Sequence, residues 1–310
     1  MEKRASGNFC RMRQQNRPVF LRLMFLILWG SGLGACSVPQ RDEVRSLDPF
    51  MRQLETLDGF PYGLSIRDLG PLRYGTVRFP LWFVEDPEAY DPLLSVLVIG
   101  GVDGRDEFSM ALMQENLNRL AQEREGERIR TDYVPLLNPY GYVYASHLTG
   151  QGQDLSGGIP ERLPQEIDRI MPLMQHKTYD LVILHMGRDH AGGLGVDLWP
   201  PPRLSSGQEG SSSQELSGQS RFQEHLADHI SFTLSRVRDR GFPVENRGRQ
   251  MTVQEPARQD APLPAVLSLR AAAPVVVLHT PRHEQMEIRI GAHLLAQNTL
   301  IRLFARNQPN

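Results

Sequence analysis

The sequence predicts a three-layer α/β/α sandwich around a mixed, mostly parallel sheet, and three features of the chain support this. Short apolar runs rich in β-branched residues recur along it, as expected of strands buried on both faces. Stretches with helical periodicity lie between these runs. Glycine, proline or polar residues end most of the runs abruptly. Strands that alternate with helices form a largely parallel sheet with helices on both faces.

The expected elements follow one another in a regular order. Residues 93–99 predict a buried strand, and a helix with an apolar stripe follows them. Before them, two alternating segments within 62–84 flank Gly70-Pro71 and predict antiparallel strands at one edge of the sheet. Three further buried strands are expected at 131–137, 179–184 and 273–278. Three further helices are expected at 161–175, 222–237 and 283–305. The stretch 241–264 is rich in proline and arginine and receives no assignment.

The N-terminus has the three regions of an export signal. Basic residues lead into the apolar run Leu23–Trp29, and small residues follow before Cys36. This run is too short to span a bilayer as a helix. Leu33-Gly34-Ala35-Cys36 resembles the bacterial lipobox, in which the cysteine is acylated and becomes the mature N-terminus. Serine rather than aspartate follows the cysteine, which by resemblance implies an anchor in the outer membrane, facing the periplasm.

These signals divide the chain into three parts. Residues 1–35 form a signal peptide, residues 36–58 a polar tether and residues 59–310 one domain. Within the domain, residues 203–220 are rich in serine, glycine and glutamine and predict a mobile surface loop.

Composition places the chain among globular proteins, with 310 residues, 40% of them hydrophobic and 23% charged. The formal net charge of −2 gives no basis for nucleic-acid binding. Residues 1–35 carry six of the 34 basic residues and one of the 36 acids, so 28 basic and 35 acidic residues remain, a net charge of −7. Cys10 leaves with the signal peptide and Cys36 is acylated, so the mature chain is expected to contain no disulfide.

Polar residues stand where three of the predicted strands end. Asp103, Asp106 and Glu107 follow the first strand, His185 the third and His279 the fourth. Because parallel strands place their carboxyl ends at one edge of a sheet, these side chains are expected to lie close together. Two carboxylates and one imidazole can bind a divalent ion, either zinc or a harder ion such as manganese. Taken singly, the same residues also fit structural roles: His185 as a satisfied core histidine and Asp103 as a turn residue.

Five motifs, in their order along the chain, resemble those of the zinc-carboxypeptidase (metallocarboxypeptidase) family. The family has a Gly-Gly-x-His-Gly-x-Glu type motif, an Asn-Pro-Asp-Gly motif, a Gly-x-Asp-Leu-Asn-Arg motif, a histidine that closes an apolar strand, and a glutamate often followed by Thr-Pro. The matching stretches here are Gly100-Gly101-Val102-Asp103-Gly104-Arg105-Asp106-Glu107, Asn138-Pro139-Tyr140-Gly141, Gly152-Gln153-Asp154-Leu155-Ser156-Gly157, Leu181-Val182-Ile183-Leu184-His185 and His279-Thr280-Pro281.

The resemblance implies a role for each matching residue. The metal ligands would be Asp103, either Asp106 or Glu107, and His185. Substrate binding would fall to Asn138, Asp154 and Ser156, although an aspartate such as Asp154 also often caps a helix or braces a loop. The general base that takes a proton from metal-bound water would be His279 or, if the terminal helix brings it in, Glu284.

The departures from the family bear directly on activity. The first ligand histidine is Asp103, the asparagine and arginine that grip a substrate's terminal carboxylate are Ser156 and Gly157, and the catalytic glutamate is His279. A serine and a glycine cannot replace a bidentate clamp. The leading hypothesis is therefore a lipid-anchored, degenerate member, or pseudoenzyme, that binds a peptide-like ligand or partner with little or no hydrolysis.

Two enzymatic alternatives stay open. One is an active metallopeptidase that uses a zinc or manganese ion and acts on cell-wall or other peptides, a substrate class inferred from the compartment alone. The other is a zinc amidase of the cell wall. The amidase leaves Asn138-Pro139 and the stretch 152–155 without an explanation, so it ranks last.

Overall fold

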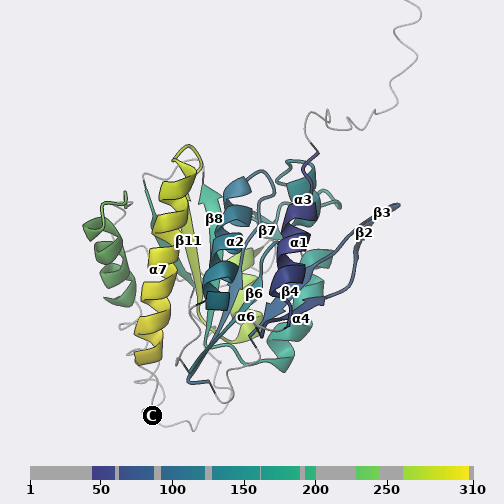
Figure 1. The fold of residues 1–310 in the computed structure, drawn as a ribbon. Coiled ribbons are helices and arrows are strands. Elements are labelled where there is room, and N and C mark those ends of the chain that lie inside the picture. The colour runs from purple at the N-terminus through teal and green to yellow at the C-terminus, as the bar shows by residue number, and fades with distance from the viewer. Residues whose placement is uncertain are drawn as a thin grey trace, which may run out of the picture. The chain divides into compact units, whose positions relative to one another are not determined.

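The computed structural model describes residues 44–59, 63–86, 92–122, 128–160, 162–188, 193–199, 228–244 and 261–306. Residues 43–310 form one compact unit (Figure 1). The predicted signal peptide at 1–35, the lipidation site Cys36 and the predicted loop at 203–220 lie outside the described residues.

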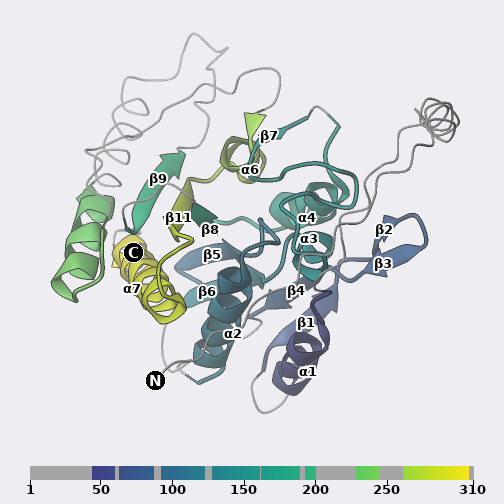
Figure 2. The ribbon, with the colours of Figure 1, turned by 90° about the horizontal axis from the view of Figure 1, so that it is seen from above.

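Within the described residues, a seven-stranded sheet runs in the order β1-β4-β6-β5-β8-β11-β9 (Figure 2). Its four central strands are mutually parallel: β6 (Ile129–Val134), β5 (Leu94–Ile99), β8 (Leu181–Arg188) and β11 (Val275–Pro281). The outer strands run antiparallel to their neighbours: β1 (Ser65–Asp68), β4 (Trp82–Glu85) and β9 (Gly195–Trp199). This mixed, mostly parallel sheet confirms the fold class expected from the sequence.

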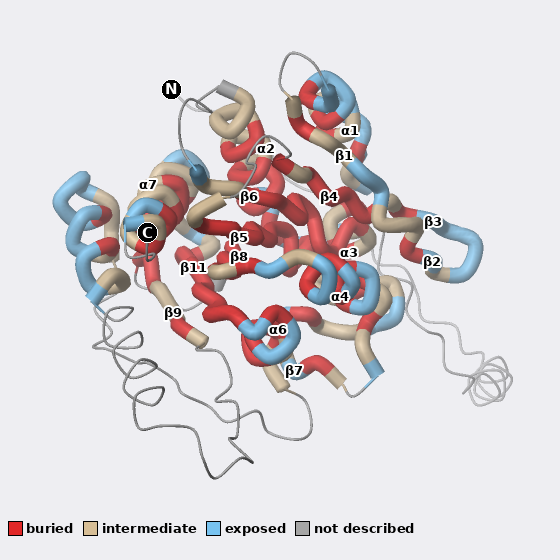
Figure 3. Tube along the Cα trace, turned by 90° about the horizontal axis from the view of Figure 1, so that it is seen from below, coloured by how far each residue is buried: buried red, intermediate tan, exposed pale blue. Residues whose placement is uncertain are grey.

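The central strands are buried because helices cover both faces of the sheet. Every residue of β5 and of β11 is buried, as Figure 3 shows along the middle of the molecule. One face carries α1 (Asp48–Leu57), α2 (Glu107–Gln122) and α7 (Met286–Arg306), and the other carries α4 (Gln165–His176) and α6 (Leu263–Ala271) (Figure 2). A continuous apolar run is the pattern that this two-sided burial requires.

Helix α1 lies within the stretch that the sequence assigns to the tether. Phe50, Leu54 and Leu57 recur at helical spacing and are all buried in the domain core. The folded domain therefore begins before residue 59, and the boundary expected from the polar composition is too late.

Four other elements differ from the expectation. The helix expected at 222–237 is described over 228–239, and residues 222–227 lie outside the described part of the chain. Helix α6 begins at the end of the stretch 241–264, which the sequence left unassigned. His185 and His279 lie inside β8 and β11 rather than at their ends, because each strand continues for two or three residues beyond its histidine.

Smaller elements surround the sandwich. They are the short helix α3 (Pro139–Val143) and two separate two-stranded ribbons, made of β2 (Leu72–Tyr74) with β3 (Val77–Phe79) and of β7 (Gly158–Ile159) with β10 (Ala261–Pro262). Among the described helices, none combines the length and the apolar character that crossing a membrane requires.

Candidate functional site

The loop after β5 carries the candidate site, and a glycine allows it to approach the chain that follows β6. Gly101 has a φ of +62°, and a Cβ at this position would stand 2.4 Å from Cδ1 of Leu136. The carbonyl oxygen of Gly101 accepts a hydrogen bond of 2.9 Å from the backbone N–H of Asn138. The loop thereby presents Asp103 and Asp106 at the carboxyl end of the central strands, where open α/β sheets place their ligands.

Two arginines hold the buried carboxylate of Asp103. Arg105 donates from Nε at 3.2 Å and from Nη2 at 2.8 Å, and its backbone N–H donates at 3.0 Å. Arg282, which follows β11, forms a second ion pair with the same carboxylate. Burial alone would raise the pKa of Asp103, but the hydrogen bonds from Arg105 and the charges of Arg282 and Arg105 outweigh it and lower the pKa.

A third arginine holds Asp106. Nη2 of Arg289, on α7, donates to Oδ2 of Asp106 at 2.5 Å, and both side chains are about 95% buried, with 5% and 4% of their surface exposed. Nε of the same guanidinium donates to the Thr280 hydroxyl at 3.2 Å, and its Cζ lies 4.1 Å from the ring centroid of Phe108. Gly187 of β8 lies against this pair, since a Cβ there would stand 2.0 Å from Oδ2 of Asp106.

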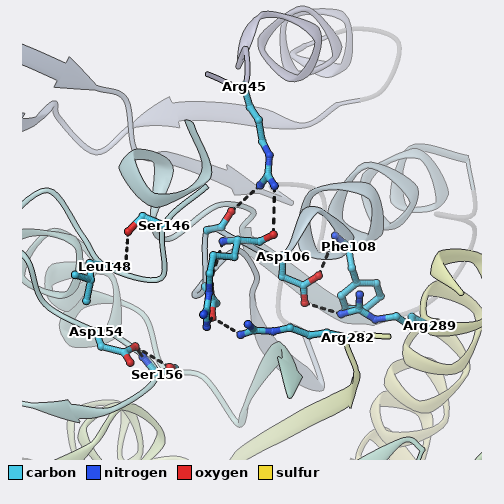
Figure 4. A network of polar contacts seen from close by, with 12 residues as sticks. Arg45, Asp106, Phe108, Ser146, Leu148, Asp154, Ser156, Arg282 and Arg289 are labelled. Atoms are coloured by element: carbon cyan, nitrogen blue, oxygen red, sulfur yellow. Dashed lines mark hydrogen bonds and ion pairs between the residues drawn. The ribbon is translucent and has the colours of Figure 1, made fainter. Parts of the chain in front are cut away.

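Figure 4 shows how these groups converge. Arg282 and Arg289 reach the loop of Asp106 from the end of β11 and from α7, while Arg45 reaches it from the N-terminal side. The two carboxylates at the metal-ligand positions of the resemblance are therefore neutralised by guanidinium groups of the chain itself.

His185 points into the core and is bonded through both ring nitrogens. Its Nδ1 lies 2.8 Å from Nδ1 of His293, and its Nε2 lies 2.7 Å from Oε1 of Gln297. The chain of hydrogen bonds continues at both ends, from His293 Nε2 to the Thr280 hydroxyl at 3.1 Å and from Gln297 Nε2 to Asn116 Oδ1 at 2.9 Å. Neither nitrogen of His185 is left to bind a metal.

These partners determine the protonation of the two histidines. Because an amide oxygen only accepts, Nε2 of His185 must donate to Gln297, so Nδ1 of the neutral ring accepts from His293. Nε2 of His293 then accepts from the Thr280 hydroxyl, and every bond in the chain is satisfied with both rings neutral. Burial lowers the pKa of His185 to about 4, and burial together with the charges of His185 and Arg289 lowers the pKa of His293 well below its ordinary value.

The two residues expected as general bases lie elsewhere. The Thr280 hydroxyl contacts His293 of α7, so the Thr280 side chain points to the face of the sheet that α7 covers. Because side chains alternate along a strand, the preceding His279 points to the opposite face. There Nε2 of His279 lies 3.5 Å from Oδ2 of Asp197 on β9. Glu284, in the turn before α7, accepts a hydrogen bond of 3.2 Å from the backbone N–H of the next residue, Gln285. Neither of these contacts involves the carboxylates of Asp103 and Asp106.

The residues expected to bind substrate instead shape loops. Asn138 caps α3, and its Oδ1 accepts from the backbone N–H of Gly141 at 2.8 Å. Oδ1 of Asp154 accepts from the backbone N–H and the hydroxyl of Ser156 at 2.9 and 2.7 Å, so these two residues form a closed turn on a separate loop (Figure 4).

Glu107, the alternative second ligand, pairs with Arg45 from the start of the described chain. Nε of Arg45 lies 3.1 Å from Oε1 of Glu107, and its Nη1 donates to the carbonyl oxygen of Gly104 at 2.8 Å. The guanidinium also lies over the ring of Tyr142, 5.5 Å from its centroid. Arg45 thus fastens the site loop to the segment that leads to the predicted anchor.

The arginines and the second histidine of the site were not predicted from the sequence, although part of the signal is visible in it. Arg289, His293 and Gln297 recur every fourth residue of α7, and all three are buried. A polar stripe on a helix face that also carries apolar core residues indicates a buried network. No comparable spacing marks Arg282, which lies in the connection between β11 and α7.

These residues do not fit a metal ion as the structure arranges them. In the part of the chain that is described, no group of three or more His, Cys, Asp or Glu side chains is placed to hold one. The face of β8 that could supply a third ligand presents Gly187 beside Asp106, and Gly187 has no side chain.

Comparison with known proteins shows the fold of metallocarboxypeptidases. No protein-family model and no curated protein matches the sequence. The structure is similar to a candidate metallopeptidase from Shewanella denitrificans, with 18% identity and a TM-score of 0.58 over 86% of this chain and 92% of that one. It is also similar to metallo-carboxypeptidases from Burkholderia cenocepacia and Pseudomonas aeruginosa, both at 15% identity. The match to the Burkholderia protein has a TM-score of 0.56 and covers 83% of this chain and 69% of that one. The match to the Pseudomonas protein has a TM-score of 0.57 and covers 84% of this chain and 68% of that one.

Proposed function

We propose that this chain is a lipid-anchored protein of metallocarboxypeptidase-like fold that binds a peptide-like ligand or partner without metal-dependent hydrolysis. One observation carries the proposal: Asp103 and Asp106, which stand at ligand positions of the resemblance, each pair with arginines of the same chain. The anchor at Cys36, the outer-membrane location and the cell-wall origin of the ligand rest on the sequence.

The arginines oppose metal binding energetically. A guanidinium keeps its charge at any ordinary pH, so Arg289 cannot lose a proton to make room for a cation. A metal that took Asp106 from Arg289 would leave a buried, unpaired charge, a change that costs roughly 3–5 kcal/mol. Both side chains of this pair are almost fully buried, so solvent cannot compensate the loss.

Hydrolysis would also lack its proton acceptor. A general base must lie within hydrogen-bond reach of the attacking water. His279 points to the opposite face of the sheet from the His185–His293 pair, and Glu284 is bonded to the backbone of its own turn. The retained fold without the assembled chemistry favours binding over catalysis.

Metal analysis of the chain from residue 37 onward tests the proposal. After incubation with zinc or manganese, we expect well below one ion per molecule and no release of amino acids from tetrapeptides or cell-wall peptides. Stoichiometric metal and a turnover that disappears in the Asp106→Asn variant would instead establish the active metallopeptidase.

The same variant has a second readout, independent of activity. Asp106→Asn should lower the free energy of unfolding by about 3 kcal/mol, because it leaves Arg289 buried without its counter-ion. Glu107→Gln is the matched control, since that carboxylate is 55% exposed and should contribute less than about 1 kcal/mol. Equal effects of the two variants would contradict the structural role of the buried pair.

The ligand half of the proposal needs a binding measurement. Tetrapeptides with a free or an amidated C-terminus serve as probes, and we expect similar affinities for the two forms because Ser156 and Gly157 replace the family's carboxylate clamp. A strong preference for the free acid would reveal a clamp. Failure of every probe to bind would count against a peptide-like ligand.

A further inference from the structure

The β2–β3 hairpin stands apart from the central sheet and has two different faces. Leu72 and Phe79 are paired across it and are buried, and the ring of Tyr74 packs on Tyr140 of α3 with centroids 5.2 Å apart. The Tyr74 hydroxyl also bonds to the buried carboxylate of Glu166 on α4. One face of the hairpin is therefore fastened to the domain, and the position of the hairpin is fixed.

The other face presents two arginines at directly opposite positions. Arg73 and Arg78 are register partners, so their side chains leave the ribbon on the same face, and both are exposed. Within the described part of the chain, neither guanidinium has a hydrogen-bond or ion-pair partner. Gly75, in the two-residue turn, has a φ of +62° and open space around its Cβ position, so the tip projects into solvent (Figure 3).

A third arginine extends this surface at the base of the hairpin. Nη1 of Arg169, on α4, lies 3.4 Å from the position that a Cβ on Gly70 would take, and Arg169 is exposed and has no ion-pair partner among the described residues. Asp68 precedes the hairpin, and its Oδ1 accepts from the backbone N–H groups of Gly70 and Leu81. Asp168 directly precedes Arg169 and forms no ion pair with it among the described residues. We call Arg73, Arg78 and Arg169 the arginine surface.

This arrangement calls for an anionic partner. Like charges directly opposite one another destabilise a two-stranded ribbon, and a solubilising role alone would be served better by opposite charges. The predicted mature chain has a net charge of −7, so two unneutralised arginines on the hairpin and a third at its base are not a consequence of overall composition. A surface rich in phosphate groups would neutralise them.

The attachment of the N-terminal segment identifies which anionic surface lies within reach. The backbone N–H of Arg45 bonds to the carbonyl oxygen of Val143 at 2.9 Å, and the neighbouring Tyr144 packs against Phe79 of the hairpin, with centroids 6.2 Å apart. The hairpin and the first described residues therefore meet on the same short segment. Arg45 lies nine positions after Cys36, and a chain of that length spans at most about 30 Å.

We propose that the arginine surface of the β2–β3 hairpin binds the anionic lipid headgroups of the membrane in which the chain is anchored. The proposal rests on the proposed lipid anchor for its location, but the binding itself requires no acyl chain. Each arginine near an anionic bilayer contributes a modest electrostatic attraction that salt weakens. Together with the tether, the hairpin would orient the domain relative to the bilayer.

Vesicle binding by the chain from residue 37 onward tests this without the anchor. Every described contact lies beyond residue 43, so the truncation removes none of them. We expect sedimentation with vesicles that contain phosphatidylglycerol but not with pure phosphatidylcholine, and loss of binding between about 0.1 M and about 1 M salt. Arg73→Glu/Arg78→Glu should weaken the binding at least about tenfold.

The matched control reverses the same number of charges elsewhere. Arg236 and Arg302 are exposed and have no partner among the described residues. They lie on the helix 228–239 and on α7, toward the β11–β9 end of the sheet, whereas the hairpin lies beyond its β1–β4 end (Figures 1 and 2). Arg236→Glu/Arg302→Glu should retain binding. If the hairpin double variant fails to fold, Arg73→Gln/Arg78→Gln removes the charges without adding repulsion and replaces it.

Three results would overturn the proposal. The first is equal binding to neutral and anionic vesicles, or to neither, which would leave an acidic protein as the partner. The second is equal weakening by the two charge-reversed variants, and the third is unchanged binding by the hairpin variant. None of these bears on acylation of Cys36 or on ligand binding in the candidate site, so failure here is distinguishable from failure of the proposed function.

Discussion

At the scale of the residue, Gly187 controls how closely β8 approaches the ion pair between Asp106 and Arg289. A Cβ at this position would stand 2.0 Å from Oδ2 of Asp106 and 2.8 Å from Nη2 of Arg289. Atoms at such distances repel strongly, so the pair can occupy its place only because residue 187 has no side chain. A glycine inside a strand commonly marks such a close approach.

Gly187→Ala should therefore destabilise the protein, although it adds a single methyl group. We expect a loss of about 2 kcal/mol in the free energy of unfolding, since the ion pair must shift within a packed core. Gly157→Ala is the control, because its Cβ would lie 3.5 Å from the closest atom, an ordinary contact, and should change stability by less than about 0.5 kcal/mol. Chemical denaturation of the two variants compares them, and equal stabilities would refute the close approach.

At the scale of the element, α7 joins the candidate site to the core through its polar stripe. Arg289 reaches Asp106, His293 reaches His185, and Gln297 bonds to both His185 and Asn116. Both histidines are held neutral in the folded protein, whereas they take up protons below neutral pH in the unfolded chain. The folded state therefore binds fewer protons than the unfolded state in that pH range.

This predicts acid sensitivity with a definite sign. The pKa of His185 falls from an ordinary value of 6.5 to about 4 on folding, so stability is complete above pH 6.5 and declines as the pH falls toward 4. The decline from His185 should be about 3 kcal/mol. The lowered pKa of Asp103 adds a loss at lower pH, below its ordinary value of 3.8.

Denaturation curves between pH 7.5 and pH 4 measure this decline. In His185→Leu/His293→Leu both titrating rings are replaced by apolar groups of similar size, so the slope over that interval should largely disappear even if the absolute stability changes. An unchanged slope in the double variant would assign the acid sensitivity to other groups.

At the scale of the whole molecule, Arg45 joins the start of the described chain to the candidate site loop. This residue binds the carbonyl oxygen of Gly104 and the carboxylate of Glu107, so the segment leading from the predicted lipid ends at the candidate site loop. The folded domain also begins earlier than its composition indicated, because α1 packs into the core.

The anchor itself is tested at its cysteine. Cys36→Ala should leave the chain without incorporated fatty acid, because the thiol is the expected acylation site. Metabolic labelling with a fatty-acid analogue measures this, and the variant should also leave the membrane fraction or stay unprocessed. Undiminished labelling of the variant would disprove a lipid at this position.

The fold class, the two-sided burial of the sheet and the order of the four central strands along the chain were determined by the sequence alone, whereas α1, β9 and α6 were not predicted. Burial leaves a local pattern in the sequence. An apolar run such as 94–99 indicates a strand buried on both faces, and helical periodicity shows which face of a helix is apolar. The position of the candidate site at the carboxyl ends of the strands followed for the same reason. The lipobox is likewise a local pattern, and it stays a prediction.

Only the tertiary structure decided what the candidate site contains. Asp103 and Arg282 are separated by 179 positions, and Asp106 and Arg289 by 183, so no local pattern could pair them. The direction of His185 also depended on the register of β8 in the sheet, because a shift of one residue turns every side chain of a strand to the other face. Which arginine pairs with which carboxylate depends on how distant segments pack together, and periodicity along the chain carries no information about that packing.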